Sequence, residues 1–228
     1  MSGVLRVFLV GAHGRMGKAV VAAAEKDSSL TIIASAVERD SVEPTLDGCD
    51  VVIDFSVAEA TAAVCRACAE NRKPLVLGTT GHNAAQKESI GAAAEKIPLV
   101  FAANFSVGVN TLFALTRRAA ELLGNEFDVD VMEIHHRTKK DAPSGTAKRL
   151  VEILANARGD ERSVTTQSIR AGDIVGEHTV LFAGPGERLE LTHRAASRET
   201  FAAGALRAAR WVMEQPAALY SMEDVLGL

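Results

Sequence analysis

Short apolar runs alternate with longer alanine-rich stretches over the first hundred residues, and this alternation constrains the fold more than any other feature of the chain. The apolar runs are Val4–Val10, Thr31–Val37, Val51–Phe55, Leu75–Leu77 and Leu99–Ala102. They are aliphatic at consecutive positions, as strands buried on both faces of a parallel sheet are. Helix-favouring segments follow the first, third and fourth runs, at Gly14–Lys26, Val57–Asn71 and Ala84–Lys96. The pattern predicts an open α/β sheet.

The pattern changes after Phe105. A helix is predicted at Gly108–Leu123, a strand at Phe127–His136 and a helix at about Gly145–Asn156. Three strand candidates then follow with no helix between them: Val164–Arg170, Ile174–Ala183 and Arg188–Arg194. Their glycine-containing connections favour a mixed or antiparallel second sheet. The last predicted helix, Glu199–Glu214, ends before Pro216 and is compatible with either domain.

Composition excludes several classes of function. Of the 228 residues 47% are hydrophobic and 24% charged, which is ordinary for a folded globular protein. The net charge of −4 gives no global attraction to nucleic acid or anionic membranes, and one Trp and one Tyr argue against a base-stacking platform. No apolar run reaches the roughly 20 residues of a membrane helix, and we read no signal peptide. We therefore expect a cytoplasmic protein without nucleic-acid or membrane partners.

A glycine-rich turn joins the first predicted strand to the first predicted helix. Gly11, Gly14 and Gly17 have the spacing G-x-x-G-x-x-G. The first glycine permits a tight turn, the second lets a pyrophosphate approach the backbone, and the third allows close packing of helix on strand. The phosphates would meet the positive end of a helix. The ordinary alternative is a tight turn that binds nothing.

Residues at three other strand ends support a nicotinamide dinucleotide. Glu38 ends the second strand, where an acidic side chain accepts hydrogen bonds from a ribose diol. Arg39 follows it and suits a 2′-phosphate, so the choice between NADH and NADPH stays open. The loops Gly78–Gly81 and Ala102–Phe105 follow the fourth and fifth strands. They would line the ligand crevice at the carboxyl ends of the strands.

The largest cluster of potentially reactive side chains lies just before the helix predicted from Gly145. His135 and His136 are followed by Arg137, Lys139 and Lys140, and then by Ser144 as a candidate helix cap. The capped helix end and the cations suit an anionic substrate, and a histidine suits proton donation near neutral pH. Strand alternation gives the two histidines different faces but does not settle which one faces a cleft. The ordinary alternative is a capped helix after a solvated loop, with one histidine buried.

The three cysteines indicate neither a metal site nor a redox site. Cys65 and Cys68 form C-x-x-C inside a predicted helix, with no second pair of ligands for zinc. We interpret both as core or helix-surface residues, and Cys49 adds nothing further. No metal site is predicted.

Segments spread over nearly the whole chain resemble one family, the 4-hydroxy-tetrahydrodipicolinate reductases of the diaminopimelate route to lysine. The resemblance is carried by Gly-Ala-His-Gly-Arg-Met-Gly (11–17), Val-Ile-Asp-Phe-Ser (52–56), Gly-Thr-Thr-Gly (78–81), Ala-Asn-Phe-Ser-Val-Gly-Val-Asn (103–110) and the stretch from Glu-Ile-His-His to Pro-Ser-Gly-Thr-Ala (133–147). It implies a Rossmann-like dinucleotide-binding domain, residues 1–106 plus about 204–228. It also implies a smaller α+β mixed-sheet domain, residues 107–203, which binds substrate and forms a homotetramer.

The resemblance further implies an activity and roles for single residues. The activity is reduction by NADH or NADPH of a small dicarboxylate cyclic imine derived from 4-hydroxy-tetrahydrodipicolinate, with release of water. By position His135 is the proton donor and Lys139 its catalytic partner, while His136, Gly145 and Thr146 hold substrate carboxylate. The implied cofactor contacts are Gly11, Ala12, His13, Gly14, Arg15, Met16, Glu38, Arg39, Gly78, Thr79, Thr80, Ala102, Ala103, Asn104 and Phe105.

Two other functions are compatible with a dinucleotide site. A semialdehyde dehydrogenase would need a cysteine nucleophile, and none of the three cysteines lies in a suitable setting. A dinucleotide-sensing protein without catalysis would bind the cofactor yet show no dependence on His135.

Overall fold

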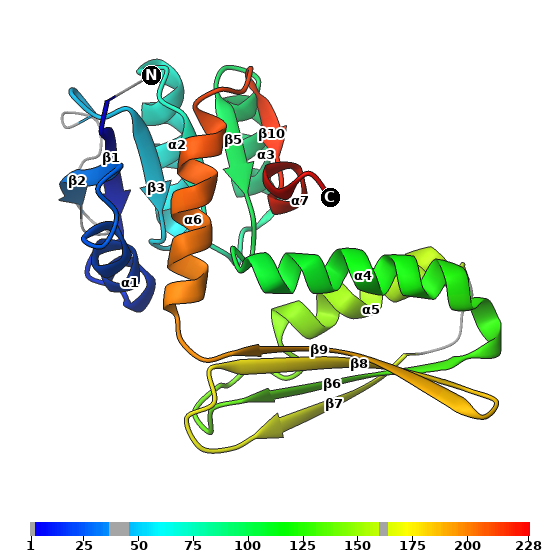
Figure 1. Cartoon of the computed structure of the whole chain (residues 1–228). Coiled ribbons are helices and arrows are strands. Elements are labelled where there is room, and N and C mark those ends of the chain that lie inside the picture. Colours follow the sequence, from blue (N-terminus) through cyan, green and yellow to red (C-terminus); the bar gives the residue numbers. More distant parts are fainter. Residues whose placement is uncertain (1–2, 37–45, 160–163) are drawn as a thin grey trace. The chain divides into compact units, whose positions relative to one another are not determined.

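The computed structural model of the chain describes residues 3–36, 46–159 and 164–228, which form two compact units (Figure 1). Unit 1 comprises Met1–Ser106 and Glu199–Gly227, and unit 2 comprises Val107–Arg198. The domain boundary predicted near residue 204 falls inside helix α6 (Glu199–Val212), and the whole of this helix belongs to unit 1. Glu38 and Arg39, two of the predicted cofactor contacts, lie outside the described residues.

Unit 1 is built on a six-stranded sheet in the order β10-β5-β4-β3-β1-β2. Every neighbouring pair is parallel, which confirms the predicted α/β class. The five predicted strands are β1 (Leu5–Val10), β2 (Leu30–Ala36), β3 (Val51–Asp54), β4 (Leu75–Leu77) and β5 (Pro98–Phe101). All positions of β3 and β4 are buried, as expected for continuous apolar runs that are covered on both faces.

Helices cover both faces of this sheet. Helix α1 (Arg15–Ala24) and α6 share one apolar core with Ile53 of β3, whereas α2 (Thr61–Glu70) and α3 (Ala84–Ala94) share the other with Val52. Successive side chains of a strand point to opposite faces, so β3 contributes to both cores. The three predicted helices of this half are therefore present.

Two short C-terminal elements were not predicted from the sequence. Strand β10 (Ala218–Tyr220) pairs with β5 at the sheet edge, and helix α7 (Met222–Leu226) follows it. A capping box between Ser221 and Asp224 starts α7. A strand of three residues is too short to show a period in the sequence.

Unit 2 contains a four-stranded sheet in the order β7-β6-β8-β9. Its strands are β6 (Asp128–His135), β7 (Thr165–Arg170), β8 (Gly176–Gly184) and β9 (Glu187–Ala195). β6 pairs parallel with β7 and antiparallel with β8, so of the two predicted alternatives the sheet is mixed. Parallel neighbours need a crossover connection, and helix α5 (Gly145–Arg158) supplies it.

One face of this second sheet is covered by α4 (Val107–Leu123) and α5 (Figure 1). Val131, Val180 and Phe182 pack against the two helices. Further along the same face the buried side chains are polar, with Glu133 and His135 on β6 and His178 on β8. In the described part of the chain no helix covers the opposite face, and no helix is long and apolar enough to span a membrane.

Candidate active site

The glycine turn of unit 1 is tight because two of its glycines have no room for a side chain. Gly11 has a φ of 81°, and a Cβ there would lie 2.5 Å from the Phe55 carbonyl oxygen. A Cβ on Gly17 would lie 2.2 Å from the Gly11 carbonyl oxygen, so the start of α1 packs directly on the turn. Gly14 is the N-cap of α1 and gives the helix no side-chain cap. These features fit a backbone cradle for a pyrophosphate at a helix N-terminus.

The remaining described cofactor candidates lie at the same edge of the sheet. Gly78–Thr80 follows β4 and Ala102–Phe105 follows β5, and both strands run parallel to β1. Phe55, which sequence reasoning did not select, joins these loops: its ring fills the space beside Gly78 and meets Phe105 edge-to-face at 5.6 Å. The Asn104 side chain accepts the Ser106 N–H at 2.9 Å, which fixes that loop locally. Within the turn, His13, Gly14 and Arg15 are exposed, whereas Gly11 and Ala12 are buried.

A buried carboxyl group lies beneath these loops. Asp54 ends β3, is fully buried, and accepts the Ser56 N–H at 2.7 Å. Burial raises the pKa of Asp54, and the hydroxyls of Ser56 and Thr79 act in the opposite direction. The Asp54 carbonyl accepts the Gly78 N–H at 2.8 Å, so the end of β3 holds the start of the Gly78–Thr80 loop.

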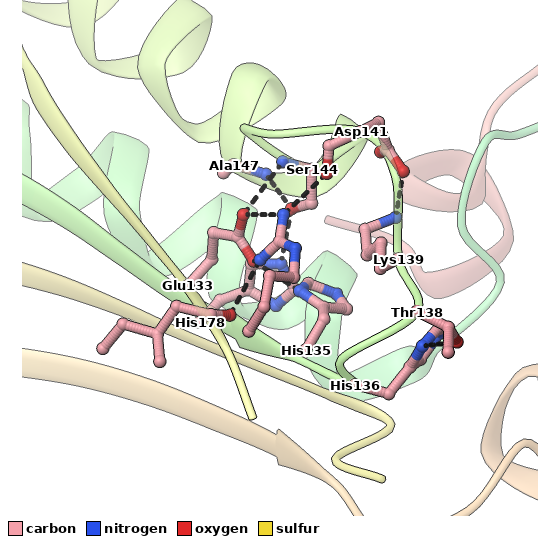
Figure 2. Close-up of polar contacts among 11 residues, drawn as sticks. Glu133, His135, His136, Thr138, Lys139, Asp141, Ser144, Ala147 and His178 are labelled. Atoms are coloured by element: carbon pink, nitrogen blue, oxygen red, sulfur yellow. Dashed lines mark hydrogen bonds and ion pairs between the residues drawn. The ribbon is translucent and has the colours of Figure 1, made fainter. Parts of the chain in front are cut away.

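The polar end of unit 2 is centred on Glu133 (Figure 2). This side chain has no exposed surface. One oxygen accepts Arg170 at 2.7 Å and the Ser144 N–H at 3.2 Å; the other accepts Arg170 at 2.8 Å and contacts His135 Nδ1. Burial raises the pKa of Glu133, but the hydrogen bonds from Arg170, Ser168 and His135, in that order of size, outweigh it and lower the pKa to about 2.

His135 is therefore the buried member of the histidine pair. Its ring contacts Glu133 through Nδ1 and meets the His178 ring edge-to-face at 5.1 Å. Burial lowers the pKa of His135, Glu133 raises it, and Lys139 and Arg170 lower it further. His136 lies beyond the end of β6, is half-buried, and bonds Thr138 through Nδ1 at 2.8 Å (Figure 2). The structure thus settles which histidine is built into the cluster.

His178 joins His135 to the start of α5. Its Nε2 lies 3.0 Å from the Ser144 hydroxyl, which in turn accepts the Ala147 N–H at 3.1 Å and caps the helix, as the sequence predicts. Burial, followed by the nearby His135, lowers the pKa of His178 to about 3, so this ring is neutral at physiological pH. Gly145 and Thr146, the predicted carboxylate contacts, form the first turn of the same helix.

Lys139 comes from the loop between β6 and α5. Its ammonium group pairs with Asp141 at 2.8 Å and is close enough to His135 to lower the pKa of that histidine (Figure 2). A second cation, Arg170, also reaches the Asp141 carbonyl, at 2.6 Å. Unit 2 therefore brings together His135 and Lys139 beside the N-terminus of α5, as an acid for an anionic substrate requires.

Among the described residues, the cysteines and the possible metal ligands form no second centre. All three cysteines are reduced and buried, and burial raises the pKa of Cys65 to about 12. A nucleophilic thiolate is thus disfavoured, which argues against the semialdehyde dehydrogenase alternative. In residues 3–36, 46–159 and 164–228 no group of three or more side chains is arranged to hold a metal.

A parallel sheet with a glycine-rich first turn, together with a mixed-sheet unit bearing a histidine, a lysine and an anion-ready helix end, defines a dinucleotide-dependent oxidoreductase. Models of the two halves of one family match nearly the whole chain. The model described as "Dihydrodipicolinate reductase, N-terminus" matches residues 5–105, and "Dihydrodipicolinate reductase, C-terminus" matches residues 108–226. The chain belongs to the dihydrodipicolinate reductase family.

Curated reductases resemble this chain over nearly the full length of both sequences. A 4-hydroxy-tetrahydrodipicolinate reductase of Akkermansia muciniphila is 47% identical over 243 residues, covering 99% of each chain. One of Halorhodospira halophila is 43% identical over 265 residues, covering 98% of this chain and 99% of that one.

A solved structure shares the fold. The dipicolinate-bound dihydrodipicolinate reductase from Paenisporosarcina sp. TG-14 aligns with a TM-score of 0.81 at 23% identity, covering 97% of this chain and 99% of that one. This likeness confirms the predicted Rossmann-like unit with a mixed-sheet unit.

Proposed function

We propose that this protein reduces 4-hydroxy-tetrahydrodipicolinate to tetrahydrodipicolinate, with NADH or NADPH as the reductant and with release of water, in lysine biosynthesis through diaminopimelate. The main support is full-length identity of 43–47% to reductases of that name. The buried Glu133–His135 pair beside Lys139 and the start of α5 supplies an acid and an anion site suited to that reaction.

Unit 1 is the proposed cofactor-binding domain. Bound NADH or NADPH supplies the hydride. The backbone from Gly11 to Met16, at the N-terminus of α1, would hold the pyrophosphate. The loops at Gly78–Thr80 and Ala102–Phe105 would hold the nicotinamide end, and Glu38 and Arg39 the adenosine ribose. Since Glu38 suits NADH and Arg39 suits NADPH, side-by-side titration with the two cofactors decides the preference.

Unit 2 is the proposed substrate domain. A dicarboxylate would meet the positive end of α5 at Gly145 and Thr146, with His136 as a further contact. Lys139 adds a cation next to His135, whose pKa it lowers. A lower pKa makes the protonated imidazole a stronger acid, which favours proton transfer to the ring being reduced. His135 thus gives the proton, and Lys139 sharpens its acidity and attracts the anionic substrate.

A coupled assay tests this function. The preceding synthase generates the substrate in situ, and the fall of reduced-nicotinamide absorbance is followed with each cofactor. For His135→Gln we expect kcat to fall by about 100-fold or more with a smaller change in KM, because the acid is lost. Lys139→Ala should be similarly severe, whereas Lys148→Ala, on the exposed surface of α5, should retain wild-type turnover.

Failure takes two distinguishable forms. No turnover with either cofactor, from folded protein that binds both, would reject the reductase and leave the dinucleotide-sensing alternative. Wild-type turnover by His135→Gln would leave the activity standing but remove His135 from its assigned role.

We further propose a homotetramer located in the cytoplasm. The support for assembly is the uncovered face of the second sheet. Met132 and Ile169 on that face are 37% and 41% exposed, and Ile134 and Leu181 accompany them on neighbouring strands. An apolar stripe of this kind is suited to contact with another copy of the chain.

A further inference from the structure

We propose that Glu133, locked in place by Arg170, is a positioning residue that fixes the tautomer of His135, so that Nε2 is the atom that carries the proton to substrate. The proposal rests on the proposed function in one respect, namely that His135 is the acid. It adds two residues, Glu133 and Arg170, to which sequence reasoning assigned no role.

The first observation is that Glu133 has no freedom to turn. Arg170 donates to both carboxylate oxygens, at 2.7 and 2.8 Å. The Ser144 N–H occupies one of these oxygens in addition. Arg170 is itself fixed by the carbonyls of Asp141 and Ile169, at 2.6 and 2.8 Å. A buried carboxylate held by a two-pronged guanidinium stays ionised and keeps its orientation.

The second observation concerns the proton on His135. An ionised carboxylate only accepts hydrogen bonds, so the Nδ1 that contacts Glu133 must carry its hydrogen. In the neutral ring Nε2 then has the lone pair, and on protonation Nε2 gains the only proton that is not directed at Glu133. The donor atom of the reaction is therefore chosen by the residue two positions earlier on the same strand.

The third observation is the space at Nε2. Gly176, the first residue of β8, lies against this nitrogen: a Cβ at that position would be 3.0 Å from Nε2 and 3.3 Å from Cδ2. Glycine leaves Nε2 uncrowded on this side, and any larger residue would press on it. This contact is independent of Glu133, so it offers a second way to disturb the same atom.

Among the described groups around His135, Glu133 is the one that counters the effect of burial on the pKa of that ring. Arg170 on β7 and Lys139 in the loop between β6 and α5 both disfavour a positive charge on His135, as burial does. His178 on β8 is neutral, His193 across from it on β9 has its pKa lowered by burial, and Asp141 is paired with Lys139. Loss of the Glu133 charge would thus lower the pKa of His135 further and leave less of the acid form.

The decisive experiment is nitrogen-15 NMR of the imidazole rings in the unmodified, full-length protein, with His135→Gln used to assign the signals. We expect neutral His135 to carry its hydrogen on Nδ1 and to show a lone-pair shift at Nε2. A hydrogen on Nε2 in the neutral ring would overturn the proposal. The measurement needs no substrate, so its outcome is separate from whether the reductase activity is found.

Variants test the consequence for the reaction. In Glu133→Gln the amide oxygen would face Arg170, and the amide N–H would then point at Nδ1 and move the ring hydrogen to Nε2. We expect kcat to fall about 100-fold or more with KM changed far less, since a wrong tautomer stops proton transfer. The limb of the kcat–pH profile that reports the acid should also move to lower pH.

The matched control is Glu177→Gln. The Glu177 carboxylate lies on β8 and pairs with Arg194, so we expect this variant to have the kcat and pH profile of the wild type. Unchanged kcat and pH profile in folded Glu133→Gln would overturn the proposal. Should Glu133→Gln not fold, the NMR measurement on the unmodified protein still decides the tautomer, and Gly176→Ala tests the role of Nε2: we expect a drop in kcat of about 10-fold or more with the Nδ1–H tautomer kept. Wild-type kcat for Gly176→Ala would show that Nε2 does not take part.

Discussion

Glu133 contacts Arg170, the Ser144 N–H and His135 in the interior of unit 2, and its charge has a consequence for stability. Its pKa is about 2 in the folded protein against an ordinary value of 4.5. A carboxyl whose pKa is depressed by folding stabilises the protein above the ordinary value, and that stabilisation is lost as the pH falls towards the folded value. Folding also lowers the pKa of the buried His135 and His178, so the protonation of these rings in acid acts in the same direction. Asp54 acts in the opposite direction, since burial raises its pKa.

The difference between wild type and Glu133→Gln isolates the Glu133 contribution. We expect the free energy of unfolding of the wild type to fall between about pH 5 and pH 2, with a smaller fall for Glu133→Gln. Urea unfolding at a series of pH values, followed by circular dichroism, measures both. Parallel curves for the two proteins would contradict the assigned ionisation of Glu133.

Residues near each other in sequence were the ones that could be predicted. His135, Lys139 and the Ser144 cap lie within one continuous motif, and the structure places all three at one end of unit 2. Arg170 is 37 residues from Glu133 and reaches it only because β6 and β7 pair in parallel. Likewise, His178 lies opposite Glu133 only because β8 pairs with β6 in this antiparallel register. Neither register can be read from a single sequence, because the candidate strands allow several pairings.

At the scale of elements, the β1–α1 turn depends on glycine for space. We expect Gly17→Ala to destabilise unit 1 by about 2 kcal/mol or more, because its Cβ would overlap the Gly11 carbonyl, and to weaken NADH and NADPH binding together. The control is Gly91→Ala in α3, where a Cβ would have no neighbour within 4 Å. This change should be neutral or stabilising by about 0.5–1 kcal/mol.

Thermal unfolding and fluorescence titration with each cofactor measure the two effects. Undiminished binding by Gly17→Ala would mean that the turn is not the pyrophosphate cradle. Equal destabilisation by both variants would mean that the close approach of α1 to the turn is not the cause of the loss.

Element type was predictable wherever a segment had a clear period or a continuous apolar run. The strands and helices of the first hundred residues follow from such runs, with end points that differ by a few residues. β10 was missed because three residues show no period, and its position is set by pairing with β5. For the second sheet, the choice between mixed and antiparallel depended on α5 acting as a crossover, which local sequence does not reveal.

At the scale of the whole molecule, the uncovered sheet face of unit 2 gives the assembly prediction. We expect Ile169→Lys, which places a charge within the apolar stripe, to convert the proposed tetramer to smaller species. The control Leu122→Lys alters a side chain on α4 that is 68% exposed and lies away from this face, and should leave assembly unchanged.

Sedimentation velocity at several protein concentrations distinguishes these species. A wild-type monomer at every concentration would reject the tetramer outright. A tetramer retained by Ile169→Lys, but lost in Leu122→Lys, would place the contact on the helices instead.

Unit 1 is assembled from both ends of the chain, and this has a consequence for biosynthesis. Its core includes Ala202, Ala205 and Leu206 of α6 and Met222 of α7, all of which follow the continuous segment of unit 2 in the sequence. Residues 107–198 of unit 2 form one continuous segment, which can leave the ribosome before α6 and α7 are made. The first hundred residues lack part of their core, and one apolar surface stays exposed, until α6 and α7 emerge. We therefore expect the earliest segment of the nascent chain to need protection from aggregation until α6 and α7 emerge, and unit 2 to mature before unit 1, against the usual order.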